Sequence, residues 1–293
     1  IHLTKSNRNV VISDCHIYAN TGIGIFYDDV YVHQSNITGC HISYNLGGGV
    51  VSRAGDVRNI QIGTCDLEVN MGPESPTTAN ILIDARGSIK GAAEIAIVGC
   101  TIQHTFKGLD GANIRIIGAS DDPVDSNNRK GNVTIANNVL SDVQTNIDLK
   151  NLYGVAVTGN TMWRGYQHSI RVEGSRKIVI ASNVMGRNPR YSTKYRPKEK
   201  NAVLIRNSQD VVFNANVLSE TQETTAGLTV ENGRRINITN NNIVDCDGPE
   251  IHLKNVSFSR VSDCILSDAR KDQPNIKTTG GTKIQIKDNL VDE

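Results

Sequence analysis

Aromatic residues are scarce in this sequence: they make up 4% of its 293 residues, and there is a single tryptophan. Large rings therefore cannot build the core, and we expect aliphatic side chains to fill it. The formal net charge is only +1, which gives no reason to expect nucleic acid or an anionic membrane as a partner. No run of about 18 apolar residues occurs, so we expect no membrane-spanning segment.

One short phrase recurs from end to end: an apolar residue, two variable residues, a cysteine or asparagine, one variable residue and a second apolar residue. It occurs eleven times, at intervals of 22 to 38 residues, and the last copy has its second apolar residue one place early. A phrase that returns at this spacing is typical of a solenoid, in which each repeat forms one rung. The central residues of the copies are Cys15, Cys40, Cys65, Cys100, Asn138, Asn160, Asn183, Asn216, Asn241, Cys264 and Asn289.

Each repeat predicts three short strands. The two apolar residues of the phrase stand five apart, about 140° from each other on a helix, so two strands that meet at a bend fit better. An apolar-x-apolar strand follows in most repeats, as at Ile147 and Leu149, and its alternation predicts one buried and one outward edge. These rungs predict an all-β fold, a right-handed parallel β-helix of about eleven rungs. We expect 1–293 to be a single domain and, because no capping element is visible, a fragment of a longer chain.

The cysteine and asparagine column is expected to lie inside a corner of the solenoid. Stacked asparagines satisfy one another's polar groups there, and cysteine suits the same place as a small buried residue. Only Cys246 lies outside the column, so we favour structural thiols over disulfides, even for Cys40 and Cys65 in adjacent rungs. The sequence has no CxxC pair and no run of histidines, which argues against zinc.

Function is expected where loops interrupt the rungs, chiefly at 71–78, 119–131 and 186–200. These loops flank the third strand of the rungs, whose outward positions form two columns. The first column reads Leu82, Arg115, Asp148, Arg171, Leu204, Thr229 and His252, and the second reads Asp84, Ile117, Lys150, Glu173, Arg206, Glu231 and Lys254. The alternating charges of the second column also fit a solvated ladder of ion pairs, worth about 0.2–1 kcal/mol per pair.

A candidate site follows from the same columns. Asp148 and Glu173 lie diagonally across adjacent rungs at roughly 7–8 Å, a separation that suits inverting glycoside hydrolysis. Their basic neighbours lower a carboxyl pKa and so favour a base over an acid. His168 and Tyr166 enter the strand from a corner and suit proton transfer. The candidate catalytic residues are Asp148, Glu173, His168 and Tyr166, and the candidate substrate-binding residues are Lys150, Arg171, Arg206, Arg115, Arg190 and Tyr191.

The rung pattern resembles the pectin-lyase-like superfamily of parallel β-helices over essentially the whole chain. That superfamily includes pectate lyases, polygalacturonases, mannuronan epimerases and phage tailspikes. The resemblance implies the fold and a preference for acidic polysaccharides, but no catalytic set is carried over. The Gly-His-Gly of polygalacturonases is missing, and the Arg187–Arg190 stretch has Ser192 where pectate lyases have a further arginine.

The function we expect is that of a carbohydrate-active enzyme that acts on a polysaccharide, in particular an acidic one, as a lyase or glycoside hydrolase. The alternative is a noncatalytic glycan-binding adhesin or a tailspike-like fibre domain. In either case the partner is a glycan, and we expect a secreted or cell-surface protein. The sequence points to no cofactor, leaves a calcium ion open, and does not set the oligomeric state.

Overall fold

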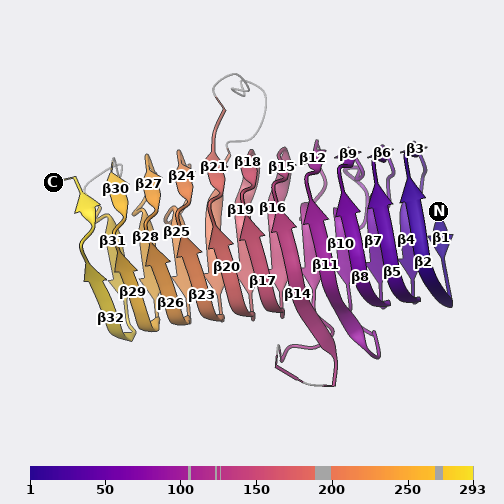
Figure 1. The fold of residues 1–293 in the computed structure, drawn as a ribbon. Coiled ribbons are helices and arrows are strands. Elements are labelled where there is room, and N and C mark those ends of the chain that lie inside the picture. Colours follow the sequence, from indigo (N-terminus) through magenta and orange to yellow (C-terminus); the bar gives the residue numbers. More distant parts are fainter. Residues whose placement is uncertain (105–106, 123, 126, 189–198, 268–272, 293) are drawn as a thin grey trace.

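The computed structural model is a right-handed parallel β-helix, as the repeat predicts (Figure 1). Each rung contributes one strand to each of three parallel sheets, and each sheet has eleven strands. The two ends of the chain lie at opposite ends of the solenoid, and the segment between β13 and β14 projects from its side. The structure describes residues 1–104, 107–122, 124–125, 127–188, 199–267 and 273–292.

The three sheets are called A, B and C, and neighbouring strands in each are three apart in sequence order. Sheet A holds β1 (His2–Leu3), β4 (Ile25–Asp28), β7 (Val50–Arg53), β10 (Ala79–Asp84), β13 (Ala112–Ile117), β16 (Val143–Lys150), β19 (Gly165–Glu173), β22 (Ala202–Arg206), β25 (Leu228–Glu231), β28 (Ile251–Lys254) and β31 (Ile276–Thr279). Sheet B holds β2 (Ser6–Ser13), β5 (Tyr31–Thr38), β8 (Asp56–Gly63), β11 (Gly91–Val98), β14 (Arg129–Ala136), β17 (Tyr153–Thr158), β20 (Arg176–Ala181), β23 (Gln209–Asn214), β26 (Arg234–Thr239), β29 (Ser257–Ser262) and β32 (Thr282–Lys287). Sheet C holds β3 (His16–Tyr18), β6 (His41–Ser43), β9 (Asp66–Glu68), β12 (Thr101–Gln103), β15 (Val139–Leu140), β18 (Thr161–Trp163), β21 (Val184–Gly186), β24 (Val217–Ser219), β27 (Asn242–Val244), β30 (Ile265–Ser267) and β33 (Leu290–Val291).

The predicted asparagine column forms a continuous ladder at the corner between sheets B and C. Asn183 shows the pattern: its Oδ1 accepts from the backbone N–H of Asn160 at 3.0 Å and from the side-chain amide of Asn160 at 2.9 Å. Its own Nδ2 donates to Oδ1 of Asn216, in the next rung, at 3.0 Å. The column is buried from Cys40 to Cys264, which confirms its predicted place inside the corner.

The residue before each column member is in the left-handed region, and this turns the chain from sheet B into sheet C. Glycine takes this conformation without strain, and other residues take it at some cost. That explains why the column is preceded by small or polar residues at most rungs. The residues concerned are Asp14, Gly39, Thr64, Gly99, Asn137, Gly159, Ser182, Ala215, Asn240, Asp263 and Asp288.

A second asparagine ladder, which we did not predict, lines the corner between sheets C and A in the first half of the chain. Asn45 donates to Asn70 at 2.9 Å, and Asn70 donates to Asn80 at 2.9 Å. Asn80 donates to Asn113 at 2.8 Å, and Asn113 donates to Asn146 at 2.8 Å. Two corners of the solenoid are therefore held by stacked amides.

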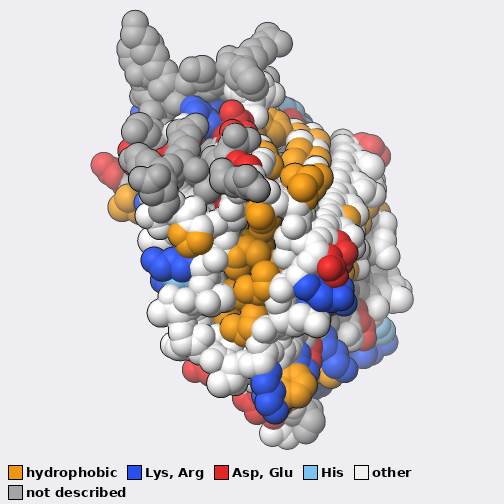
Figure 2. Space-filling view, turned by 90° about the vertical axis from the view of Figure 1, so that its left-hand side faces the viewer, with side chains coloured by type: hydrophobic (Ala, Val, Ile, Leu, Met, Phe, Trp, Pro, Cys, Tyr) orange, Lys and Arg blue, Asp and Glu red, His pale blue; other side chains and the backbone are white. Residues whose placement is uncertain are grey.

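All six cysteines are free thiols, as expected. Burial raises the pKa of the Cys246 thiol to about 12, so this thiol stays protonated and unreactive at neutral pH. Aliphatic residues fill the interior along the whole axis. Figure 2 looks along this axis from the end that carries the last strands, where a central band of hydrophobic side chains is bordered by polar ones. Among the described residues, no helix is long and apolar enough to cross a membrane.

Candidate functional site

The two outward columns of candidate residues lie on sheet A, and strand pairing confirms the register of both. Leu82 pairs with Arg115, Arg115 with Asp148, and Asp148 with Arg171. In the second column Lys150 pairs with Glu173, in register one rung apart. The columns continue through β22, β25 and β28. The rung repeat thus places the charged residues of these two columns in register.

The centre of this face is a salt-bridge network around Asp148. Arg115 donates from Nε to Oδ2 of Asp148 at 2.6 Å, and Arg171 donates to both carboxylate oxygens at 2.8 and 2.7 Å. Burial alone would raise the pKa of Asp148, but the hydrogen bonds from Arg171 and the charge of Arg115 hold it below its usual range. The carboxylate is therefore ionised, with both oxygens occupied.

The expectation of solvated outward charges is wrong for two of these residues. The side chains of Arg115 and Asp148 are only 6% and 9% exposed. Asp110, which precedes β13, lies over this part of the face: its backbone oxygen accepts from Arg115 at 2.7 Å, and its carboxylate lies 3.4 Å from Arg171. A segment that precedes the strand thus buries charges that the alternation pattern assigns to solvent.

His168 lies further along the same face, in the wall of a cavity of about 240 Å³. Charged and hydroxyl side chains surround it, including those of Lys200, Arg206 and Thr229. The Nδ1 atom of His168 is buried and has no hydrogen-bond partner. Burial, reinforced by the charge of Arg171, lowers its pKa to about 4. The imidazole is therefore neutral at neutral pH and able to accept a proton.

Arg206 and Glu231 also line this cavity, and they belong to the part of the predicted charge ladder that forms. Arg206 donates to Glu231 at 2.8 Å, and Lys254 donates to the other oxygen of Glu231 at 3.0 Å. Burial alone would raise the pKa of Glu231, but hydrogen bonds from Lys254 and Arg206 hold it below its usual range. Among the described residues, neither Lys150 nor Glu173 has an ion pair, so the ladder stops short of them.

The remaining predicted residues lie apart from His168. Lys150 and Glu173 line another hollow, of about 630 Å³, which Asp121 and Asp122 of the 119–131 loop also border. Tyr166 is 2% exposed and donates to Asp142 at 3.2 Å inside the molecule. Arg190 and Tyr191 lie outside the described residues. The structure therefore groups His168 with Arg206, and Lys150 with Glu173.

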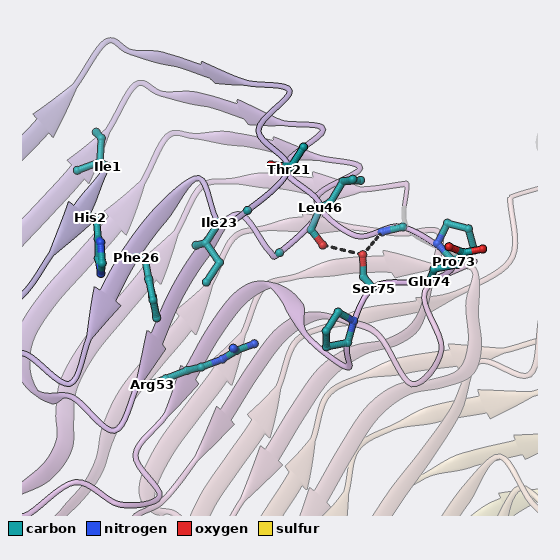
Figure 3. Close-up of a pocket in the computed structure, with 14 residues that line it drawn as sticks. Ile1, His2, Thr21, Ile23, Phe26, Leu46, Arg53, Pro73, Glu74 and Ser75 are labelled. Atoms are coloured by element: carbon teal, nitrogen blue, oxygen red, sulfur yellow. Dashed lines mark hydrogen bonds between the residues drawn. The ribbon is translucent and has the colours of Figure 1, made fainter.

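The first rungs of the same face form a larger, more apolar cavity of about 800 Å³ (Figure 3). The rings of His2 and Phe26 stack in its wall, with centroids 5.2 Å apart and planes at 10°. Leu46 and Arg53 border it from neighbouring rungs. Ser75 fixes the overlying loop by donating to the backbone oxygen of Leu46 at 2.6 Å.

A cluster of side chains that could hold a metal ion, which we did not predict, lies on the outer face of sheet C. His41 on β6 pairs directly with Asp66 on β9, and Glu68 follows on the same face of β9. One ligand atom from each of these three residues lies within 4.8 Å of the other two. A signal was present in the sequence, because His41 and Asp66 each directly follow a cysteine of the repeated phrase.

Known proteins place the chain first in a fold class and then in a family. The mannuronan C-5 epimerase AlgE6 A-module of Azotobacter vinelandii is similar over 98% of this chain and 89% of its own, with a TM-score of 0.54 and 12% identity. DFA-IIIase of Arthrobacter chlorophenolicus is similar over 91% of this chain and 67% of its own, with a TM-score of 0.52 and 12% identity. At such low identity these likenesses show the fold, which is the parallel β-helix that the resemblance implied.

A family model is more specific than these folds. Residues 80–257 match the family described as Periplasmic copper-binding protein (NosD). Because the match spans more than half of the 293 residues, the chain belongs to the NosD family. No curated protein sequence matches the chain.

Proposed function

We propose that the chain is a carbohydrate-active protein that binds an acidic polysaccharide along the outer face of sheet A and acts on it beside His168. The observation that carries this proposal is the His168 imidazole, which lines a cavity with a neutral ring and an unpaired buried Nδ1. A buried polar atom without a partner costs about 1–3 kcal/mol and calls for an explanation. A neutral imidazole held for a substrate supplies one: it is a weak base at a pKa of about 4, and the carboxylate of a bound uronate would raise that pKa and strengthen it as a base.

The reaction that suits this base is β-elimination from a uronate. His168 takes the proton next to the carboxylate, the electron pair forms a double bond to the neighbouring carbon, and the glycosidic bond there breaks. The leaving oxygen then takes a proton, so no oxidant or reductant is needed. Lys200 and Arg206 border the same cavity, and their positive charges would stabilise the carboxylate as negative charge builds up on it.

The other charged and aromatic groups of this face would bind the polymer. Arg171 is held by both oxygens of Asp148, so Asp148 serves as its anchor rather than as an acid or base. The stacked rings of His2 and Phe26 offer an apolar platform for a sugar at the far end. Stacked strands lie about 4.8 Å apart, so the face from β4 to β22 would span roughly 30 Å, enough for several sugars.

A noncatalytic glycan-binding role is the second candidate. It is favoured by the closed network of Arg115, Asp148 and Arg171, in which both carboxylate oxygens are already occupied. In that case the face would supply only fixed charges to a bound polymer. His168 separates the two candidates, because a binder does not need its basicity.

The test is to incubate the protein with polygalacturonate, alginate, glycosaminoglycans and neutral glucans. Unsaturated products would be followed by ultraviolet absorbance, new chain ends by reducing-sugar assay, and binding by calorimetry. We expect elimination on an acidic polymer, and His168→Gln should lower kcat by at least tenfold with little change in KM. The matched control is His33→Gln on sheet B, which should behave as the parent. Binding without turnover would favour the second candidate, and neither binding nor turnover on any polymer would refute both.

The family description names copper and the periplasm, and both carry over to this chain only as proposals. We propose that the protein works outside the cytoplasm, where a polysaccharide substrate is found. Nitrogen and oxygen donors suit Cu(II), and His41, Asp66 and Glu68 offer one such nitrogen and two such carboxylates. The donor chemistry of this cluster fits the metal.

A further inference from the structure

Strand β19 departs from the regular rung, and the departure surrounds His168. The strand has nine residues, whereas its neighbours β16 and β22 have eight and five. Against β16, one extra residue lies between Gly165 and His168. Against β22, one extra residue lies between His168 and Ile170. Among the strand pairs that the structure describes, only these two change register in this way. Such a bulge is rare between parallel strands, and bulges re-aim side chains next to active sites.

Asn201, the residue before β22, is bonded to both ends of this bulge. Its backbone N–H donates to the oxygen of Gly165, and its Oδ1 accepts from the N–H of Gly165, both at 2.9 Å. Its backbone oxygen accepts from the hydroxyl of Ser169 at 3.1 Å. Asn201 is fully buried, so water does not compete for these three bonds, which we call the Asn201 clamp.

The residue types at the clamp suit its geometry. Asn201 has a φ of +50°, a left-handed conformation that asparagine tolerates better than most residues do. A Cβ added at Gly165 would lie 2.4 Å from the backbone oxygen of His168, so glycine allows the chain this close approach. Ser169 takes the place in β19 that Asn146 has in β16. The contact of Ser169 with Asn201 therefore follows the second asparagine ladder at this corner.

We propose that Asn201 is a positioning residue, which holds the bulge of β19 and so keeps the His168 imidazole in the wall of its cavity of about 240 Å³. Lys200 and Ala202, on either side of Asn201 in the chain, line the same cavity. The clamp therefore also fixes these two residues relative to His168. Its effect on turnover rests on the proposed function of His168, but the placement of the ring can be measured without a substrate.

The surroundings of His168 supply that measurement. Burial is the main cause of its low pKa, about 4, and nearby positive charges lower it further. The charged groups that face the ring are Arg171 on β19, Asp148 on β16, Lys200 and Arg206 at β22, and Glu223 and Glu231 in the next rung. Substitution of Asn201 removes none of these charges. A change in the pKa of His168 would therefore report a change in the position or burial of its ring.

The test is a nuclear magnetic resonance titration of His168 in the full chain, with the signal assigned by its loss in His168→Gln. Asn201→Gly tolerates the same φ, keeps the backbone bonds and removes the side-chain acceptor for Gly165. We expect the pKa of His168 to rise from about 4 toward the ordinary 6.5, because the ring gains access to water. On a polymer that the parent cleaves, kcat should fall by about ten- to a hundredfold while KM stays within about twofold, because the base is misplaced and the binding groups are kept.

A second variant and a matched control isolate the clamp. Ser169→Ala removes the bond at the other end of the bulge and should raise the pKa of His168 by a smaller amount, so the clamp is tested even if Asn201→Gly does not fold. The control is Asn207→Gly. Asn207 lies at the other end of β22, has a φ of +51° and is exposed. This control should keep the pKa and kcat of the parent.

The outcomes separate the clamp from the proposed reaction. If the parent cleaves no polymer but Asn201→Gly still raises the pKa of His168, the clamp stands and the reaction fails. If the parent cleaves a polymer and both clamp variants keep its pKa and kcat, the reaction stands and the clamp is refuted. A raised pKa with unchanged kcat would overturn the positioning role, and so would an equal rise of the pKa in Asn207→Gly.

Discussion

Replacing Asn183 by leucine tests whether the asparagine ladder stabilises the solenoid. The leucine side chain fills the space but removes the Oδ1 that accepts from the backbone N–H of Asn160 at 3.0 Å. It also removes the Nδ2 that donates to the backbone oxygens of Val157 and Ala181, both at 3.0 Å. Asn183 is 1% exposed, so water cannot replace these bonds.

The expected cost follows from the group left without a partner. The side chain of Asn160 keeps bonds to two other carbonyls, those of Ile135 and Thr158, so its backbone N–H is the main orphan. An unsatisfied buried donor costs about 1–3 kcal/mol. For a chain of this length that corresponds to a drop of roughly 2–8 °C in melting temperature.

Asn183→Cys is the informative companion variant. Cysteine occupies the same column at Cys100, where its thiol contacts the oxygen of Val98 at 3.7 Å. At Cys264 the sulfur accepts from Asn241 at 3.8 Å. We therefore expect Asn183→Cys to lose less stability than Asn183→Leu. Asn36→Leu, at an exposed outward position of β5, should change stability by less than about 0.5 kcal/mol.

The measurements are thermal unfolding by circular dichroism and hydrogen exchange of individual amides. The amide of Asn160 should exchange much faster in Asn183→Leu than in the parent. The reasoning is refuted if that amide stays protected and the melting temperature of Asn183→Leu matches that of Asn36→Leu. It is also refuted if the cysteine variant proves less stable than the leucine variant.

Three further predictions concern other parts of the chain. The pKa of His168 in the folded state is about 4, below the ordinary 6.5, so the free energy of unfolding should fall by about 3 kcal/mol as the pH drops from 6.5 to 4. Activity should be lost near pH 4, as His168 becomes protonated in the folded state. A His168 titration near pH 6.5 by nuclear magnetic resonance would contradict this prediction. Asp148→Asn should cost about 3–5 kcal/mol in urea unfolding because the buried Arg115 loses its buried carboxylate and keeps only the exposed carboxylate of Asp110, at 3.4 Å. A loss below about 1 kcal/mol would show that the network is not needed. Gly131→Ala should lower the melting temperature strongly, because Gly131 has a φ of +96° and the added Cβ would lie 1.9 Å from the backbone oxygen of Tyr153. In the control Gly22→Ala, the added Cβ meets nothing within 4 Å, so the melting temperature should not change.

The sequence predicts the parts of the fold that depend on one rung and its neighbours. The column of Asn160 and Asn183 follows from the period alone, because equivalent residues in stacked rungs must lie above one another. The second ladder carried a similar signal in its first half: Asn45 and Asn70 each stand five residues after a cysteine of the phrase. It continues through Asn80 on β10, where that spacing changes, so the phrase alone could not have traced it.

The candidate site was less predictable because loops and side-chain contacts decide it. Strand alternation places Asp148 outward, and only the fold of the preceding segment, with Asp110 over Arg115, buries it. Charge alternation predicted a ladder from Lys150 to Lys254, but among the described residues its ion pairs form only between Glu231 and its two neighbours, Arg206 and Lys254. A long side chain can reach several oppositely charged partners. Strand register fixes where the backbone lies but does not determine which of these ion pairs forms.

Each strand pairs only with the equivalent strands of the rung before and the rung after it. Two distant sites are therefore connected only through the rungs between them. The cluster of His41, Asp66 and Glu68 on β6 and β9 is separated from the His168 cavity on β19 and β22 by the rungs of β12 and β15. In such an array energetic terms pass between nearest neighbours, so coupling decays with every rung that remains folded. The binding free energies of ligands at the two sites should therefore add. Each site could be altered, or moved together with its own rungs, without a change in affinity at the other.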